Sequence, residues 1–194
     1  MGDSTRYQKL ILASGSPRRA EILRAVGWPF ETLGANVDET LRKGESPGDY
    51  VCRLALTKAD AVAARVTPGL LVLGADTTVV VAEEICGQPQ DAGDARRMLQ
   101  LLRGRWHEVL TGVALVQAGA KDKRLVDHQV TRVRFAAMSA AEIDWYVATG
   151  EPEGKAGAYA IQGQAAIFIE EVQGDYFNIV GLPVRLVYQL AQRI

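Results

Sequence analysis

Apolar and amphipathic segments alternate along this chain, and the two patterns predict different elements. Short apolar runs are typical of buried strands, and they occur at 9–14, 30–35 and 69–76, with a strand and turn over 77–87. Helical spacing of apolar residues predicts helices over 17–26, 46–66, 91–102, 139–150 and 182–194. Two long antiparallel strands are expected over 105–117 and 125–135, and a further strand over 165–174.

The order of these elements predicts the fold class. Strands that alternate with helices imply an α/β fold, in which helices flank a mixed β-sheet. The antiparallel part of that sheet comes from the pair of strands within 105–135. Neither an internal repeat nor a linker of low complexity interrupts the pattern. We therefore expect one domain over residues 1–194.

Composition and charge narrow the classes of partner. The 194 residues are 48% hydrophobic and 23% charged, which suits one globular domain with a sizeable core. A net charge of −1 gives no overall attraction to nucleic acid or to an anionic membrane. We therefore expect neither partner, and any anion site must be built locally.

The cysteines and the first nine residues, here called the leader, indicate the cellular compartment of the protein. Cys52 and Cys86 lack metal-ligand spacing, so we expect two free thiols in a reducing compartment. The first nine residues lack the apolar core of a signal peptide, and no apolar run approaches the roughly 20 residues of a membrane span. These features favour a cytoplasmic protein.

Two arginines lie at the N-terminal end of a predicted helix, where a positive charge is unfavourable. Ser16 and Pro17 start the predicted helix, so Arg18 and Arg19 lie in a first turn that ordinarily favours anions. A bound phosphate explains the pair, because converging backbone N–H groups and guanidinium groups both bind it. The alternative is that both side chains point to solvent, at a cost of roughly tenths of a kcal/mol.

Lys58 lies within the apolar stripe of the helix predicted over 46–66. The other members of that stripe, by helical spacing, are Val51, Leu54, Ala55, Ala59 and Val62. A lysine in such a position either extends to the rim of the core or is held where an anion needs it. A phosphate site nearby favours the second interpretation.

Carboxylates follow two apolar segments. Asp76 ends the run 69–76, and the ligands of such sheets gather outside the carboxyl ends of the strands. Asp76 can hold a divalent metal or take a proton from water, or it can merely end the strand in a turn with Thr77. Asp38 and Glu39 add carboxylates after another apolar segment, and two carboxylate sites beside a phosphate favour Mg²⁺ or Mn²⁺.

Small residues crowd the segment 155–170, around Lys155, Tyr159 and Gln162. They leave room for the backbone to approach a ligand closely. The Gln162 amide carries a carbonyl beside an NH₂ group, which matches the pairing edge of uracil or thymine, and after a flip that of cytosine. A glutamine that faces solvent is the alternative.

These four places, in this order, resemble the Maf family of nucleoside triphosphate pyrophosphatases. The resemblance covers nearly the whole chain and rests on the motifs "SGSPRR", "VDET", "RLALTKA", "LGADTTVV", "GEPEGKAGAYAIQG" and "GDYFNIVGLPV". It implies an elongated, two-lobed α/β domain with a twisted mixed sheet and a central nucleotide-binding groove. It also implies hydrolysis of a nucleoside triphosphate to the monophosphate and pyrophosphate, with a divalent metal.

The resemblance implies a role for each matching residue. Asp76 matches the catalytic carboxylate, and we expect it to hold the metal together with Glu39. The family's substrate-selecting positions correspond to Arg18, Thr77 and Gln162. The positions that line its polar groove correspond to Ser16, Arg19, Glu39, Lys58 and Lys155.

The motifs "GADT" and "KAGAYAIQG" resemble the branch that acts on dTTP and UTP. The branch that acts on 7-methylguanosine triphosphate, the alternative substrate, carries "SDQ" at the position of the first of these motifs, "GADT". One departure is Gln88, where many relatives carry lysine, and Arg96 or Arg97 is a candidate substitute. The rival class is a nucleotide-sensing protein that regulates septum formation. The sequence leaves open the physiological substrate, the preferred metal and whether the chain forms a homodimer.

Overall fold

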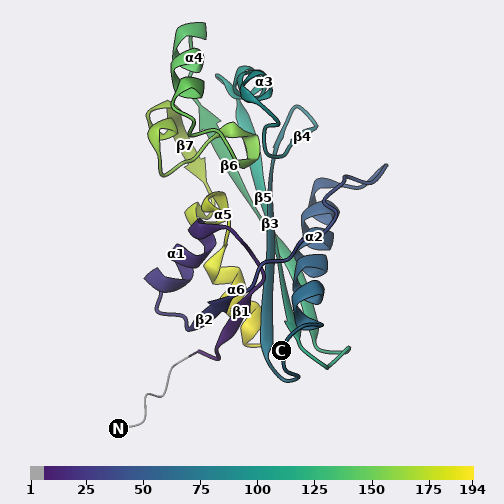
Figure 1. Cartoon of the computed structure of the whole chain (residues 1–194). Helices are drawn as coiled ribbons and strands as arrows, with labels where there is room; N and C mark the ends of the chain where they lie inside the picture. Colours follow the sequence, from purple (N-terminus) through teal and green to yellow (C-terminus); the bar gives the residue numbers. More distant parts are fainter. Residues whose placement is uncertain (1–6) are drawn as a thin grey trace. The chain divides into compact units, whose positions relative to one another are not determined.

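The computed structural model describes residues 7–194, so most of the leader lies outside the described residues (Figure 1). The first elements along the chain are β1 (Leu10–Leu12), α1 (Pro17–Ala25), β2 (Phe30–Thr32), α2 (Pro47–Ala63), β3 (Leu71–Val81) and β4 (Glu84–Cys86). They are followed by α3 (Ala92–Leu102), β5 (Trp106–Gln117), β6 (Arg124–Phe135), α4 (Ala140–Ala148), β7 (Ile169–Gln173), α5 (Tyr176–Val180) and α6 (Val184–Ala191). Two short 3-10 helices lie at Ala156–Ala158 and Gln164–Phe168.

The strands form one mixed sheet. Within residues 7–194 it has seven strands in the order β2-β1-β3-β5-β6-β7, with β4 paired to β3. β1 runs parallel to β2 and to β3, whereas β4 is antiparallel to β3 and β7 is antiparallel to β6. A mixed sheet flanked by helices confirms the predicted α/β class.

The helix starts agree with their sequence signals. Ser46 accepts a hydrogen bond from the Asp49 amide and Pro47 occupies the first turn of α2, while Asp91 caps α3. Ser139 begins α4 with a complete capping box, in which Glu142 bonds back to the cap.

The prediction that Asp76 ends its strand is wrong. β3 continues through Asp76 to Val81, because the residues that follow are β-branched and favour extended backbone (Thr77, Thr78 and Val79 to Val81). The strand predicted over 165–174 also begins later, at Ile169. The Gln164 and Ala165 amides bind the Glu151 carboxylate instead of a neighbouring strand.

The chain divides into two compact units. The first unit contains the residues up to Asp76, Thr111–Gln129 and Gly181–Ile194, and the second contains Thr77–Leu110 and Val130–Val180. In the first unit α2 covers one face of the sheet, and α1 and α6 lie on the other (Figure 1). The core under α2 comprises Ile11, Ala13, Ala55, Ala59, Val62, Val72, Ala114 and Val116.

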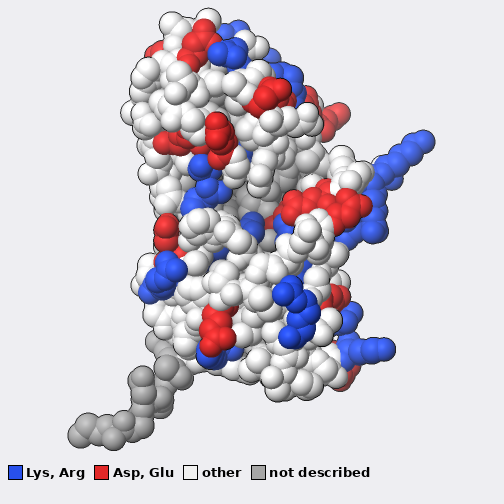
Figure 2. All heavy atoms as spheres, viewed as in Figure 1, with Lys and Arg blue, Asp and Glu red and all other residues white. Residues whose placement is uncertain are grey.

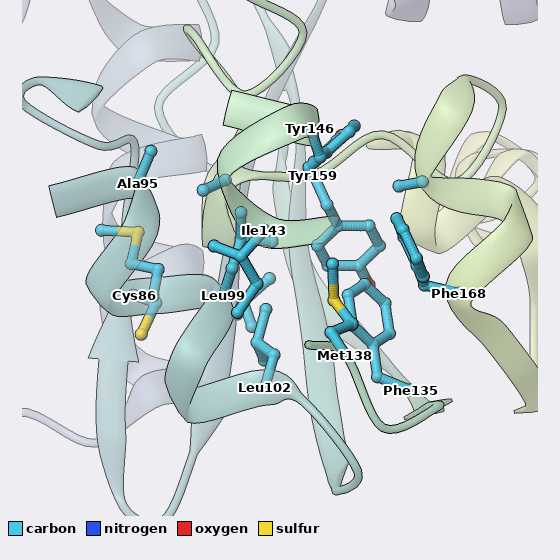
Figure 3. Packing of buried hydrophobic residues seen from close by; sticks show 14 of the residues in the cluster. Cys86, Ala95, Leu99, Leu102, Phe135, Met138, Ile143, Tyr146, Tyr159 and Phe168 are labelled. Carbon is cyan, nitrogen blue, oxygen red and sulfur yellow. The ribbon is translucent and has the colours of Figure 1, made fainter. Parts of the chain in front are cut away.

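The core of the second unit is rich in aromatic and sulfur-containing side chains (Figure 3). Helices α3 and α4 contribute Leu99, Leu102, Ile143 and Tyr146, and the sheet contributes Phe135. Cys86 is buried in this core and Cys52 is half-buried on α2. Both thiols are free, as predicted.

The surface carries both signs of charge. Acidic and basic side chains are interspersed over the face drawn in Figure 2. Among residues 7–194 we find no helix with the length and apolar character that a membrane crossing requires.

Candidate active site

Two glycines let helix α2 lie directly on the sheet. A Cβ at Gly74 of β3 would lie 2.1 Å from the backbone oxygen of Ala55, and one at Gly112 of β5 would lie 2.2 Å from that of Val51. Such distances are far below van der Waals contact, so a larger residue at either position would push the helix away. Because alternate residues of a strand share a face, Asp76 points to the same side as Gly74, toward α2.

Lys58 of α2 forms a buried ion pair with Asp76. Its Nζ donates to Oδ1 of Asp76 at 2.6 Å and lies 2.7 Å from Oε1 of Glu39. Lys58 is 8% exposed and Asp76 is 7% exposed, whereas the side chain of Glu39 is half exposed. Lys58 therefore does not extend to the rim of the core, and two carboxylates hold it inside.

The neighbouring carboxylate, Asp38, is turned away from this group. It accepts hydrogen bonds from the Thr40 amide at 2.9 Å and the Thr40 hydroxyl at 2.6 Å, and these bonds lower its pKa. The backbone oxygen of Glu39 accepts from the Tyr50 hydroxyl at 3.0 Å, which ties this loop to α2. Of the two carboxylates in "VDET", it is Glu39 that contacts Lys58.

Arg19 turns inward from the first turn of α1. Its Nε donates to the backbone oxygen of Gly181 at 2.8 Å, and its Nη1 donates to Oγ of Ser14 at 3.1 Å. Burial lowers the pKa of Arg19, while the charges of Asp76 and Glu39 raise it. The guanidinium therefore belongs to the same electrostatic group as the buried ion pair.

Arg18 and Ser16 complete this end of α1. Arg18 is half-buried, and burial lowers its pKa while Glu21 opposes that shift. Ser16 stands at the cap position, yet within the described chain its side chain makes no capping hydrogen bond. The first turn of α1 also contains no acidic residue, so no carboxylate of its own offsets its N–H groups.

Asp76 has a pKa above the ordinary value for aspartate. Burial is the largest cause, because a desolvated carboxylate is costly to ionise. The charges of Lys58 and Arg19 act in the opposite direction but do not outweigh burial. A carboxylate with a raised pKa accepts a proton more readily, which suits a general base.

Asp76 and Glu39 also have the chemistry of ligands for a hard divalent cation. Both carboxylates contact the Nζ of Lys58 through one oxygen each, so the two side chains lie close together, and a metal ion would be held by their other oxygens, beside the ammonium group. Mg²⁺ is commonly held by one or two carboxylates, completed by water and substrate phosphates. No group of three or more His, Cys, Asp and Glu side chains able to hold a metal occurs in residues 7–194. The two carboxylates therefore fit a cation that the substrate helps to hold.

Three predicted site residues belong to the second unit. Thr77 follows Asp76 on β3 and points to the opposite face of the strand. Lys155 precedes a 3-10 helix, and its Nζ donates to the backbone oxygen of Glu153 at 3.1 Å. Gln162 lies in an exposed turn.

The turn that carries Gln88 lies beside the segment 155–163. The Gly157 amide donates to the backbone oxygen of Gly87 at 3.0 Å. The two candidate substitutes for a lysine at position 88 are both ion-paired. Arg96 contacts Asp144 at 2.5 Å, and Arg97 contacts the carboxylates of Glu84 and Asp94.

Sequence reasoning missed two groups that hold Arg19. Ser14 lies at the end of β1, where its Oγ also accepts a hydrogen bond from the Ser16 amide at 3.1 Å. Gly181 has a φ of +118°, so its backbone suits glycine, and its carbonyl accepts from Arg19. The only signal for Gly181 was its place in the motif "GDYFNIVGLPV".

Comparisons with known proteins find relatives that are similar over nearly the whole chain. A relative from Symbiobacterium thermophilum, named dTTP/UTP pyrophosphatase, is 55% identical over 183 residues, which are 94% of this chain and 92% of the relative. A protein of the same name from Bacillus thuringiensis subsp. konkukian is 50% identical over 186 residues, 95% of each chain.

A solved structure shares the fold. The HAM1 protein of Coxiella burnetii superposes with a TM-score of 0.56 at 15% identity, covering 95% of this chain and 99% of that one. The family described as Maf-like protein matches residues 9–194. With that match, and with relatives at half identity or more over nearly its whole length, the chain belongs to the Maf family.

Proposed function

We propose that this chain is a nucleoside triphosphate pyrophosphatase that hydrolyses dTTP and UTP to the monophosphate and pyrophosphate. The names of its relatives from S. thermophilum and B. thuringiensis support the substrates. The structural observation that carries the proposal is the buried pair of Lys58 and Asp76, with Glu39 in contact with the same Nζ. The activity would clear such nucleotides from the cellular pool.

Asp76 is the general base in this proposal. Lys58 holds Oδ1, so Oδ2 is the oxygen that takes the proton of the attacking water. The oxygen of that water forms a bond to the α-phosphorus as the bond to the leaving pyrophosphate breaks. Burial raises the pKa of Asp76 and thereby favours the proton transfer.

The cationic side chains offset the charge of the triphosphate. Arg18 and Arg19 stand at the first turn of α1, beside Ser16, where backbone N–H groups also favour an anion. Arg19 is fixed by Ser14 and the Gly181 carbonyl, so little side-chain freedom is lost when phosphate binds. Fixed donors of this kind stabilise charge that develops in the transition state.

A divalent cation, Mg²⁺ or Mn²⁺, is the implied cofactor. Asp76 and Glu39 would hold it, and when bound it would neutralise phosphate charge and acidify a bound water. Lys58 contacts both carboxylates and so limits their mutual repulsion.

Base selection is assigned to Gln162, with Thr77 and Lys155 as further substrate contacts. The Gln162 carbonyl can accept from the N3–H of uracil or thymine, while its NH₂ group donates to the 4-carbonyl. Cytosine offers the reverse pattern at those positions, so an amide held in one orientation discriminates between them.

Pyrophosphate release from a panel of triphosphates tests the proposal. With Mg²⁺ or Mn²⁺ we expect faster release from dTTP and UTP than from dCTP, the purine triphosphates and 7-methylguanosine triphosphate. A chelator should abolish release, and added metal should restore it. Asp76→Asn should lower the rate by about a hundredfold or more while the variant remains folded by circular dichroism.

Three outcomes would contradict parts of the proposal. No release from any triphosphate with any metal would favour a nucleotide sensor over an enzyme. Preferential release from 7-methylguanosine triphosphate would reassign the substrate. An unfolded Asp76→Asn variant, checked against Glu170→Gln at an exposed ion pair, would mean that Asp76 is structural.

A further inference from the structure

The Glu151 carboxylate follows α4 and binds backbone donors of the segment that comes after Gln162. Its Oε2 accepts from the Gln164 amide at 2.9 Å, and its Oε1 accepts from the Ala165 amide at 3.2 Å. Partial burial raises the pKa of Glu151, but the bonds from Gln164, Tyr146 and Ala165, together with the charge of Lys155, keep the pKa below its ordinary value. Glu151 is therefore an anion seated on two N–H groups.

Tyr146 extends this arrangement to the other side of Gln162. Its hydroxyl donates to Oε1 of Glu151 at 2.8 Å and accepts from the Ala160 amide at 3.3 Å. Ala160 and Gln164 each lie two residues from Gln162, so the turn is anchored symmetrically. One carboxylate and one hydroxyl thus fix the backbone on both sides of a side chain that is itself exposed.

Gly163 shows how closely the turn is held. A Cβ at this position would lie 2.3 Å from Oε2 of Glu151. The φ of Gly163 is −114°, which any residue adopts, so glycine is needed here for space alone. The turn and the carboxylate are in direct contact, so a methyl group at this position would displace the carboxylate from its place.

The anchors are rigid because the core supports them. Tyr146 is fully buried, and the centroid of its ring lies 6.3 Å from that of Phe168. Both side chains belong to the core drawn in Figure 3. Tyr159, which precedes the turn in the chain, is also buried, and its ring packs edge-on against those of His107 and Phe135. The turn of Gln162 is exposed, but the buried side chains that hold it restrict the motion of its backbone.

We propose that Glu151 and Tyr146 are positioning residues that fix the turn of Gln162 and thereby set the enzyme's preference for uracil and thymine over cytosine. The inference rests on the proposed function and extends it. Neither side chain needs to touch the substrate. Their effect passes through the orientation of the Gln162 amide, which must stay fixed if it is to reject the reversed pattern of cytosine.

We call the contacts of Glu151 and Tyr146 with the turn of Gln162 the clamp. Three variants perturb the clamp in different ways. Tyr146→Phe keeps the ring packing and removes the hydroxyl. Glu151→Gln keeps the size and places an NH₂ group against an N–H donor. Gly163→Ala keeps both anchor residues but places a methyl group against the Glu151 carboxylate, which must then move. Glu170→Gln and Gly34→Ala are matched controls, because Glu170 lies in an exposed ion pair and a Cβ at Gly34 meets open space.

The measurement is kcat and KM for UTP and CTP with each variant. We expect the UTP-to-CTP ratio of kcat/KM to fall by about fivefold or more in the three clamp variants, through a higher KM for UTP. Gln162→Ala should lower the same ratio by about tenfold. Combining Glu151→Gln with Gln162→Ala should lower it no further than Gln162→Ala alone. Both controls should retain the wild-type ratio.

Hydrogen exchange gives a readout that is independent of turnover. The Gln164 and Ala165 amides should exchange faster in Glu151→Gln than in the wild type, while the core strands stay protected. Equal losses of activity on UTP and CTP, or an additive double variant, would mean that the clamp is merely structural and would overturn the inference. A wild-type chain that releases no pyrophosphate would instead refute the proposed function itself.

Discussion

His107 of β5 is buried and uncharged, and this makes the stability of the chain depend on pH. The ring is 3% exposed, it packs edge-on against Phe135 and Tyr159, and its Nε2 lies 2.9 Å from the Tyr159 hydroxyl. Among the described residues Nδ1 has no hydrogen-bond partner. An imidazolium has two N–H groups to satisfy, and burial accordingly lowers the pKa of His107 to about 3.

The sign and size of the effect follow from proton linkage. The unfolded chain binds a proton at the ordinary pKa of 6.5, whereas the folded chain does not until about pH 3. The contribution of His107 to the free energy of unfolding is therefore greatest above pH 6.5 and is lost progressively as the pH is lowered toward 3. At 1.36 kcal/mol per pH unit, a change from pH 7.5 to 4.5 removes about 2.7 kcal/mol through this residue.

Urea unfolding at both pH values measures this contribution. His107→Gln places an amide beside the Tyr159 hydroxyl without a group that titrates. The loss of stability between pH 7.5 and 4.5 should be smaller in this variant than in the wild type by about 2–3 kcal/mol. His128→Gln is the control for removing a histidine. The same pH dependence in wild type and His107→Gln would refute the reasoning.

Three further predictions follow from named contacts. Gly74→Ala should lower the free energy of unfolding by about 1–3 kcal/mol or more by urea titration, because the new methyl group meets the backbone of α2, whereas Gly34→Ala should not. Arg19→Lys keeps the charge but replaces the two nitrogens that bond Gly181 and Ser14 with one on a flexible chain, so kcat/KM should fall about tenfold or more. Burial raises the pKa of Cys52 and Cys86 to about 11, so iodoacetamide should label them at pH 7.5 at less than about a hundredth of the rate of free cysteine, by mass spectrometry.

Local sequence signals predicted the elements well. The stripe that includes Lys58 identified the buried face of α2, because burial repeats with the helical period. The capping residues Ser46, Asp91 and Ser139 marked helix starts, because the side chain that satisfies the first amides lies within three residues. Such signals depend only on neighbours along the chain.

Features that depend on distant partners were not predictable in the same way. Arg19 and Gly181 are 162 residues apart, and no local pattern indicates their contact. Asp76 was expected at a strand end because it ends the apolar run 69–76, yet it lies within β3, where Lys58 of α2 pairs with its charge. The only signal for Glu151 was its place in the motif "GEPEGKAGAYAIQG", since its bonds to Gln164 and Ala165 form only when the turn closes.

The edge strands of the sheet affect the tendency of the protein to aggregate at high concentration. β2 and β7 stand at the two ends of the strand order and are only three and five residues long. Short edge strands offer few unpaired backbone amides and carbonyls to another chain. Glu170 and Glu171 put negative charge on β7, and Glu31 does so on β2 beside Lys9. Because Glu31 is paired with Lys9 and Glu170 with Arg134, it is the shortness of these edge strands, more than their charge, that limits pairing with a second copy.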